Sequence, residues 1–281
     1  AFTSNGGSSK YYGLFDLYTL PTRGGTPKKL APTKDRRAHI IGWTQGGKSL
    51  LIREFAGTST HLFEVPVNGD SPRKITQDPG VRLHSSYQAS ADQLTFSYIN
   101  LTTPPEIYIS NRRRPDRQRL TDLNRDLPKP RMGKTEKISW TGPGDEKIEG
   151  LITYPVGYEK GEKVPLVLHV HGGPHAAHLR DFKGFPDLYV EQVYAQHGYA
   201  VLQPNPRGST GYGKDFRSAV VERWGKEDFQ DLMKGVDHVI EMGVAHPDSL
   251  AIMGWSYGGY MTANAVTKTD RFEAASMGAA V

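Results

Sequence analysis

A 45-residue repeat runs through the first half of the chain and restricts the folds that this half can adopt. Two dipeptide marks keep the spacing, an apolar pair at Leu17-Tyr18, Leu62-Phe63 and Ile107-Tyr108, and a basic-apolar pair at Lys29-Leu30, Lys74-Ile75 and Arg119-Leu120. Short strand-like runs and turn residues lie between the marks. This pattern is typical of propeller blades, each a four-stranded sheet, and it favours blades over an ordinary β-sandwich.

We therefore expect residues 1–127 to form part of a β-propeller, with about two to three blades at this spacing. A closed ring needs about four to eight blades. Because the chain also lacks an initial Met, we expect further blades on its N-terminal side.

Residues 128–281 follow a different pattern, in which continuous apolar runs alternate with amphipathic segments. Helical spacing of apolar residues ends before Gly225 and again before Gly243. The expected buried strands are PLVLHV, YAVLQP, LAIMGW and EAASMGAAV, preceded by a hairpin from EKISW to EGLITYP. Strands and helices in alternation predict a mostly parallel sheet with helices on both faces.

Ser256 is the candidate nucleophile, because it occupies the centre of a Gly-x-Ser-x-Gly turn with Gly254 and Gly258. The turn follows the expected strand Leu250–Met253 and precedes an expected helix over Tyr257–Lys268. A serine on such a strand-to-helix turn has an exposed hydroxyl, and the flanking glycines leave room for its strained backbone. The alternative is a Gly-rich turn whose serine only caps the helix.

Acyl transfer also needs donors for the oxyanion. The backbone N–H of Tyr257 is the first, because it lies at the N-terminal end of the expected helix. The second is Gly173 in the loop HGGPHAAH, or the phenol of Tyr212 in the loop NPRGSTGYG, each of which follows an expected strand at the same sheet edge. Arg207, in the second of these loops, could receive a substrate carboxylate or brace its own turn.

The three loops HGGPHAAH, PNPRGSTGYG and GWSYGGYM, in this order and behind a 45-residue β-repeat, resemble the prolyl oligopeptidase family of serine peptidases. The His-Gly-Gly-Pro sequence is similar to that of the acylaminoacyl-peptidase-like branch. The resemblance implies an α/β-hydrolase domain capped by a β-propeller that restricts entry to short peptides. It also implies Gly173 as the second oxyanion donor in the acylaminoacyl branch, or a tyrosine matching Tyr212 in prolyl oligopeptidase and dipeptidyl peptidase relatives.

The other two members of a catalytic triad are not evident in the sequence. In α/β-hydrolases the Asp and then the His follow the serine, but only Asp270 and no His follow Ser256 here. We expect Asp270 to end the nucleophile helix or to pair with Arg271. The chain is therefore expected to be the incomplete N-terminal part of an α/β-hydrolase domain, cut before its triad Asp and His. Loss of triad partners costs about 10⁴ to 10⁶ in turnover, so this portion alone should be nearly inactive.

Four histidines, His169, His171, His175 and His178, lie close together before Ser256. One of them could act as an upstream base, with His175 the foremost candidate, but packing or surface roles are favoured. Their spacing also resembles a metal site, yet no acidic ligand follows before Asp181, so no metal and no cofactor are expected.

The composition of the chain excludes several classes of chemistry and of binding partner. The chain has 281 residues, no cysteine and a net charge of +5, which excludes disulfides and thiol chemistry and gives no nucleic-acid footprint. No run reaches the roughly 18 apolar residues of a membrane span. The basic run NRRRPDRQR is expected to be a solvated loop and strand edge. Compartment and oligomeric state do not follow from these features.

The sequence thus predicts a serine-type peptidase, acylaminoacyl-peptidase-like or dipeptidyl-peptidase-like, that hydrolyses short peptides through an acyl-enzyme on Ser256. A carboxylesterase would use the same turn and oxyanion donors. A non-catalytic protein that binds partners through its blades is a third interpretation, which the intact serine turn and glycine loop disfavour.

Overall fold

The structure is a computed structural model that describes residues 1–6, 15–114, 116–128, 131–184 and 190–280. The chain divides into two compact units, each described below by itself. Unit 1 contains Ala1–Leu127 together with two short later segments, Leu179–Phe182 and Gly211–Lys214. Unit 2 contains Pro128–His178, Lys183–Thr210 and Asp215–Val281.

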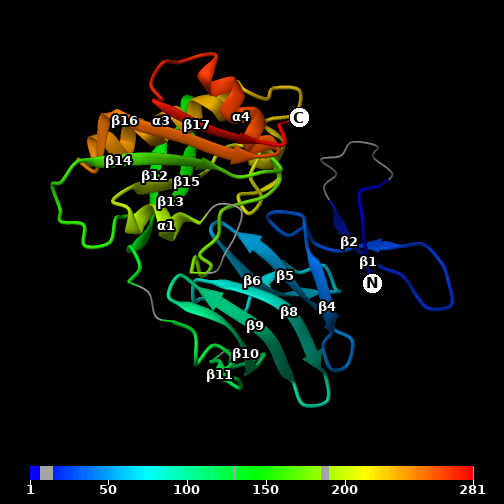
Figure 1. Cartoon of the computed structure of the whole chain (residues 1–281). Coiled ribbons are helices and arrows are strands. Elements are labelled where there is room, and N and C mark those ends of the chain that lie inside the picture. The colour runs from blue at the N-terminus through cyan, green and yellow to red at the C-terminus, as the bar shows by residue number, and fades with distance from the viewer. Residues whose placement is uncertain (7–14, 115, 129–130, 185–189, 281) are drawn as a thin grey trace. The chain divides into compact units, whose positions relative to one another are not determined.

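Among its described residues, unit 1 consists of antiparallel sheets (Figure 1). A three-stranded sheet has the order β1 (Phe2–Ser4), β2 (Asp16–Thr19), β3 (Lys28–Lys29). A four-stranded sheet has the order β4 (His39–Trp43), β5 (Ser49–Ala56), β6 (Ser59–Pro66), β7 (Arg73–Lys74). Another has the order β11 (Gln118–Arg119), β10 (Thr103–Asn111), β9 (Gln93–Asn100), β8 (Val81–Gln88).

The 45-residue spacing seen in the sequence also appears in the strand register. Equivalent residues pair across the last two strands of each sheet, as Tyr18 with Lys29, Phe63 with Lys74, and Tyr108 with Arg119. In each of these three sheets, the apolar pair therefore lies on one strand, and the basic residue of the second pair lies on the short strand next to it. The spacing follows from a supersecondary unit that recurs with the same pairing.

Apolar side chains from successive sheets form the cores of unit 1. One core is built from Leu51, Leu62, Ile75, Leu94, Phe96, Tyr98 and Tyr108, which come from both four-stranded sheets and the chain between them. A second core contains Leu17, Leu30, Leu50, Ile52 and Val65. Alternation along β5 directs Leu51 into the first core and Leu50 and Ile52 into the second, so both faces of this strand are buried.

Part of the basic run at 111–119 is not solvated as expected. Arg112 is largely buried and pairs with Glu64 at 2.9 Å and with Asp92 at 2.8 Å. Arg119 pairs with the fully buried carboxylate of Glu106 at 2.9 Å. Several charges of this run are therefore used inside unit 1, since buried charges need paired and hydrogen-bonded partners. Pro115, also in the run, lies outside the described residues.

Unit 2 contains a six-stranded mixed sheet. Its strand order is β12 (Thr135–Thr141), β13 (Lys147–Thr153), β15 (Ala200–Asn205), β14 (Val164–Val170), β16 (Ala245–Trp255), β17 (Ala274–Gly278). The four strands from β15 to β17 run parallel, whereas β12 and β13 form the expected antiparallel hairpin and join the sheet antiparallel to β15. Parallel strands end at the same sheet edge, which brings together the loops that follow β14, β15 and β16.

Helices pack on both faces of this sheet (Figure 1). On one face, Tyr194 of α1 (Glu191–Gln196) packs against a core of Val167, Val201 and Met253. On the other are α3 (Glu227–Glu241) and α4 (Tyr257–Val266), and α4 contacts β14, β16 and β17. Within the described residues, every helix falls short of the length and apolarity that crossing a bilayer requires.

Two expected elements differ from the structure. The helix expected before Gly225 is only α2 (Lys214–Ser218), and turns follow it. The run EAASMGAAV was expected to be buried, but most of β17 is exposed, with Met277 57% accessible. The reason is its place at the end of the strand order, where it has only β16 as a neighbour. Val281, the last residue of that run, lies outside the described residues.

Candidate active site

Ser256 occupies a sharp turn between β16 and α4. Its backbone has φ 57° and ψ −121°. This conformation is energetically unfavourable for any residue that has a side chain. Space at this turn requires glycine on either side. A Cβ atom at Gly254 would lie 2.4 Å from the carbonyl oxygen of Gly258, and one at Gly258 would lie 2.1 Å from the carbonyl oxygen of Val170. The turn thus has the sharp strand-to-helix geometry of a nucleophile elbow, as the Gly-x-Ser-x-Gly pattern predicts. We refer to this turn as the elbow.

Backbone hydrogen bonds hold the elbow from both sides. The Ser256 N–H donates to the carbonyl of Gly278 at 3.0 Å, and the Ser256 carbonyl accepts from the Tyr260 N–H at 2.9 Å. The first bond ties the turn to the end of β17 and the second starts α4. The strained backbone is therefore over-determined by its surroundings, as such conformations require.

The His-Gly-Gly-Pro loop lies beside the elbow. Val170 at the end of β14 pairs with Gly254 of β16 in parallel register, so the two strands end together. A Cβ atom at Gly172 would lie 3.6 Å from the Cβ of Ser256 and 3.2 Å from the carbonyl oxygen of Trp255. Gly173 follows with φ 125°, in the region that favours glycine.

Donors for an oxyanion are present on both segments. The backbone N–H of Tyr257 is the first of α4, and the first N–H groups of a helix have no acceptor within it. Among the described residues, the N–H of Gly173 has no acceptor either. The helix dipole adds positive potential at this end of α4. The elbow can therefore stabilise negative charge that develops next to Ser256.

Tyr257 also anchors the elbow through its side chain, which is completely buried. Its hydroxyl donates to Asp228 Oδ2 at 2.6 Å, and burial followed by the Asp228 charge raises the pKa of this phenol well above its usual value. Asp228, at the start of α3, also accepts from the Gly225 N–H at 3.1 Å. Asp228 could not be selected from the sequence, since acidic residues in the first turn of a helix, here Glu227 and Asp228, ordinarily indicate a favourable helix dipole interaction.

Two of the four clustered histidines, His169 and His178, belong to a buried polar network. His169 Nδ1 contacts Glu191 Oε1 at 2.9 Å, and the same oxygen accepts from Gln203 Nε2 at 2.6 Å. His178 Nε2 donates to the His169 carbonyl at 3.0 Å. Burial lowers the pKa of His178 well below its usual value, so this side chain is neutral near pH 7. Among the described residues, no set of three or more His, Asp or Glu side chains is grouped to hold a metal ion.

The other two histidines of the cluster, His171 and His175, make contacts within and between loops. His171 Nδ1 donates to the Gly172 carbonyl at 2.7 Å and its Nε2 contacts Ser209 Oγ at 2.9 Å. Burial lowers the pKa of His171 to about 4. His175 Nδ1 donates to the Gly208 carbonyl at 2.9 Å. Within the described part of the chain, no histidine hydrogen-bonds to Ser256, so these rings connect loops to each other.

Arg207 braces its own turn. Its Nε and Nη2 donate to the two carboxylate oxygens of Asp231 at 2.9 and 2.6 Å, and its backbone N–H donates to Asp231 Oδ2 at 2.9 Å. The carboxylate is fully buried, and the Arg207 side chain is 13% exposed. This geometry matches the expectation that Arg207 braces its own turn, and not the expectation that it receives a substrate carboxylate. The other candidate in the same loop, Tyr212, falls in the segment Gly211–Lys214 that belongs to unit 1.

Comparison with known proteins gives independent evidence on the class of protein to which this site belongs. The sequence profile described as "Prolyl oligopeptidase family" matches residues 187–281, which include the elbow. The chain is 30% identical over 257 residues to a Bacillus subtilis protein named uncharacterized peptidase YuxL, covering 90% of this chain and 36% of that protein. It is 28% identical over 256 residues to dipeptidyl-peptidase 5 of Aspergillus oryzae, covering 87% of this chain and 34% of that protein.

The part of the chain that contains the elbow is therefore similar to the prolyl oligopeptidase family. Solved structures agree at the level of the fold. An acylaminoacyl peptidase from Pyrococcus horikoshii superposes with a TM-score of 0.75 at 25% identity, covering 95% of this chain and 41% of that chain. A puromycin-hydrolysing peptidase from Mycobacterium tuberculosis gives a TM-score of 0.72 at 22% identity, with 95% and 43% covered. The chain spans 36% and 34% of the two curated relatives above, about a third of their length.

Proposed function

We propose that this chain carries the nucleophile of a serine-type peptidase that hydrolyses short peptides, with a preference of the acylaminoacyl-peptidase or dipeptidyl-peptidase kind. The observation that carries the proposal is the strained elbow at Ser256, held next to a glycine loop. A serine that only capped the helix would not need this backbone conformation, since N-cap residues ordinarily have extended φ and ψ. In addition, the Ser256 side chain makes no capping hydrogen bond to α4.

The proposed reaction is acyl transfer through Ser256. Ser256 Oγ attacks the carbonyl carbon of the scissile peptide bond and forms a tetrahedral intermediate. The negative charge on the former carbonyl oxygen is received by the N–H of Tyr257 and by a second donor, Gly173 or the phenol of Tyr212. Collapse of the intermediate breaks the C–N bond, releases the amine and leaves an ester on Ser256, which water then hydrolyses.

Proton transfer needs a general base and a carboxylate that orients it. The elbow lies in a fold whose triad members follow the serine, and no histidine follows Ser256 in residues 257–281. No residue of this chain is therefore proposed as the triad Asp or His. Residues 1–281 alone would then be nearly inactive, with a loss of about 10⁴ to 10⁶ in turnover.

We further propose that the sheets of unit 1 are blades of a β-propeller that limits the substrate to short peptides. Support comes from the recurring 45-residue pairing and from the four-stranded antiparallel sheets. Support also comes from the fold-level likeness to peptidases of this architecture. Residues 1–127 would supply about two to three blades at this period.

The test of the nucleophile is covalent labelling of the complete gene product with a fluorophosphonate probe, followed by peptide mapping. We expect one labelled site, Ser256, and loss of labelling in Ser256→Ala. Ser90→Ala removes an exposed hydroxyl in unit 1 and should label as the wild type does. Labelling of another residue in the wild type would refute the assignment. Hydrolysis of simple esters with no turnover of N-acetylated or free dipeptidyl substrates would replace the peptidase by an esterase.

A further inference from the structure

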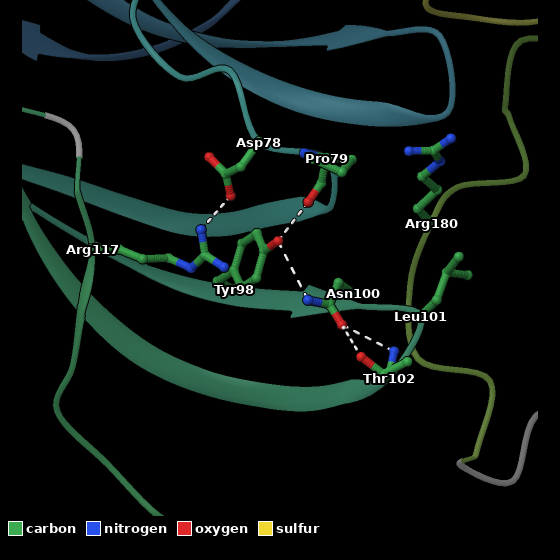
Figure 2. A pocket seen from close by; sticks show the side chains of 8 residues that line it. All are labelled: Asp78, Pro79, Tyr98, Asn100, Leu101, Thr102, Arg117 and Arg180. Carbon is green, nitrogen blue, oxygen red and sulfur yellow. Dashed lines mark hydrogen bonds and ion pairs between the residues drawn. The ribbon is translucent and has the colours of Figure 1, made fainter.

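Unit 1 contains a cavity that the proposed chemistry at Ser256 does not use. Its volume is about 300 Å³, at the lower end of the range of small-ligand sites. The lining residues, all within unit 1, are Asp78, Pro79, Tyr98, Asn100, Leu101, Thr102, Arg117 and Arg180 (Figure 2). We refer to this cavity as the Arg180 pocket.

Arg180 is the unusual member of this lining. It lies on the segment Leu179–Phe182, separate from the strand that carries Tyr98 and Asn100 (Figure 2). Its backbone N–H donates to the Thr58 carbonyl at 2.8 Å. Within the described part of the chain, its guanidinium has no hydrogen bond or ion pair, and its Nε is shielded from solvent without an acceptor. A shielded guanidinium N–H without an acceptor is costly, so a ligand that supplies acceptors would be bound favourably.

The other cations beside the pocket are already paired. Arg82 and Arg117 each donate to one oxygen of the Asp78 carboxylate. Arg117 also lies over the ring of Tyr98, 4.0 Å from its centroid, and Arg82 lies 5.0 Å from it. Two guanidinium groups therefore share the Asp78 carboxylate, and Arg180 adds a further cation to the lining, so the pocket carries an excess of positive charge.

Several polar groups of the wall are engaged with one another. The Tyr98 hydroxyl donates to the Pro79 carbonyl at 2.5 Å. Asn100 Oδ1 accepts from the Thr102 N–H at 2.9 Å and from the Thr102 hydroxyl at 3.1 Å. The free hydrogen-bonding capacity of the wall is thus concentrated in the donors of Arg180. A guanidinium presents its N–H groups in a planar fork, which matches the two oxygens of a carboxylate.

We propose that the Arg180 pocket binds a carboxylate of a short peptide, with the Arg180 guanidinium as its bidentate donor. The N–H groups of the Arg180 guanidinium would bind the two carboxylate oxygens, and the excess of positive charge in the pocket would favour an anion. The volume of the pocket suits the end of a short peptide. Two sources share this chemistry, the C-terminal carboxylate of a peptide and the side chain of Asp or Glu. The site is independent of the chemistry at Ser256 and can be tested without turnover.

The experiment is calorimetric titration of the complete gene product carrying Ser256→Ala, so that no probe is consumed. The probes are Ac-Ala-Ala-Ala-OH, the same peptide as its C-terminal amide, and Ac-Glu-Ala-Ala-NH₂. We expect a carboxylate-bearing probe to bind at least about tenfold more tightly than the neutral amide, since charge-assisted bidentate bonds are about twice as strong as neutral ones. The free acid and the Glu peptide distinguish the two sources. Affinity should fall as salt is raised.

Variants locate the site. Arg180→Gln should abolish the preference for the carboxylate, and Arg180→Lys should retain a reduced preference, because it keeps the charge and loses the fork. Arg23→Gln removes an equal charge from an exposed position and should bind as the parent does. Equal binding of acid and amide by the parent overturns the proposal without any variant, as does unchanged preference in folded Arg180→Gln.

The result is also separable from the assignment of Ser256. Acid-selective binding in a protein that the fluorophosphonate does not label would leave the Arg180 pocket standing and refute the nucleophile. Labelling at Ser256 in a protein that binds acid and amide equally would do the reverse.

Discussion

At the scale of single residues, Tyr257 has two separate roles at the elbow. Its backbone N–H is the first of α4 and is the oxyanion donor that we propose, and its buried phenol fixes the start of α4 by donating to Asp228. The ring also packs edge-on against Trp224, with centroids 5.1 Å apart. The backbone donor can therefore survive a change of side chain, and the anchoring can be measured separately.

We predict that Tyr257→Phe destabilises the protein by about 1.5–3 kcal/mol, the usual contribution of a hydrogen bond to a charged group. Ser256 should still react with a fluorophosphonate, because the backbone N–H is retained. Urea unfolding measures the first effect and labelling the second. Tyr260→Phe is the matched control, since no hydrogen bond of the Tyr260 hydroxyl occurs among the described residues, and it should change stability by less than about 0.5 kcal/mol. Equal effects of the two substitutions would contradict the anchoring role.

Residue-level prediction from the sequence succeeded where a short motif carries the chemistry. The Gly-x-Ser-x-Gly spacing predicts the turn at Ser256 because the residues that mark it lie within five positions of the sequence. The partners that hold the site could not be predicted this way. Asp228 is 29 residues from Tyr257 in sequence, and Asp231 is 24 residues from Arg207. Nothing local marks either carboxylate as the one that will be buried there.

At the scale of elements, the site depends on how closely α4 approaches β14. The contact is between backbones, because Gly258 in the first turn of α4 faces the carbonyl of Val170. A side chain at this position would push the helix away from the sheet. The elbow would then lose the geometry that places Ser256 beside the His-Gly-Gly-Pro loop.

We predict that Gly258→Ala destabilises the protein by about 3 kcal/mol, at the upper end of the usual cost of overpacking, because its Cβ would meet a backbone atom. Labelling of Ser256 should slow about 100-fold, the scale of a misplacement of roughly 1 Å. Gly42→Ala is the control, since its Cβ would have 4.0 Å to the nearest atom, the Tyr87 ring, and stability should be nearly unchanged. Normal labelling rates in Gly258→Ala would show that this approach does not control the site.

Element boundaries were predictable from the sequence where periodicity was strong and neighbours were local. The helix expected over Tyr257–Lys268 is observed as Tyr257–Val266, and the hairpin of β12 and β13 has the expected strands. The burial of β17 was not predictable, because its apolar composition says nothing of its position in the strand order. Likewise the pairing of Arg112 with Glu64 spans 48 residues, so the basic run alone indicated only a solvated surface.

At the scale of the whole molecule, the chain passes between its two units more than once. Leu179–Phe182 and Gly211–Lys214 interrupt the sequence of unit 2 and belong to unit 1. The second segment is held by Asp35, whose Oδ1 accepts from the N–H groups of Gly211 and Gly213 at 2.8 and 3.3 Å. The Gly211 carbonyl also accepts from the Gly57 N–H at 2.8 Å.

We predict that Asp35→Ala loosens this segment and accelerates hydrogen exchange of the Gly211 and Gly213 amides by about tenfold or more, since bonds to a charged acceptor contribute about 1.5–3 kcal/mol. Exchange measured by mass spectrometry on the complete gene product would detect it. Asp70→Ala, at an exposed turn, should leave these amides unchanged. Unaltered protection in Asp35→Ala would mean that other contacts hold the segment.

The interleaving of the two units limits how evolution or an engineer can recombine them. Swapping residues 1–127 as a cassette with those of a relative would separate Asp35 from Gly211 and Thr58 from Arg180, because each pair is encoded on opposite sides of the crossover. A successful chimera would have to carry the two short loops along with the N-terminal half. Exchange of this half alone should therefore be rare among functional hybrids.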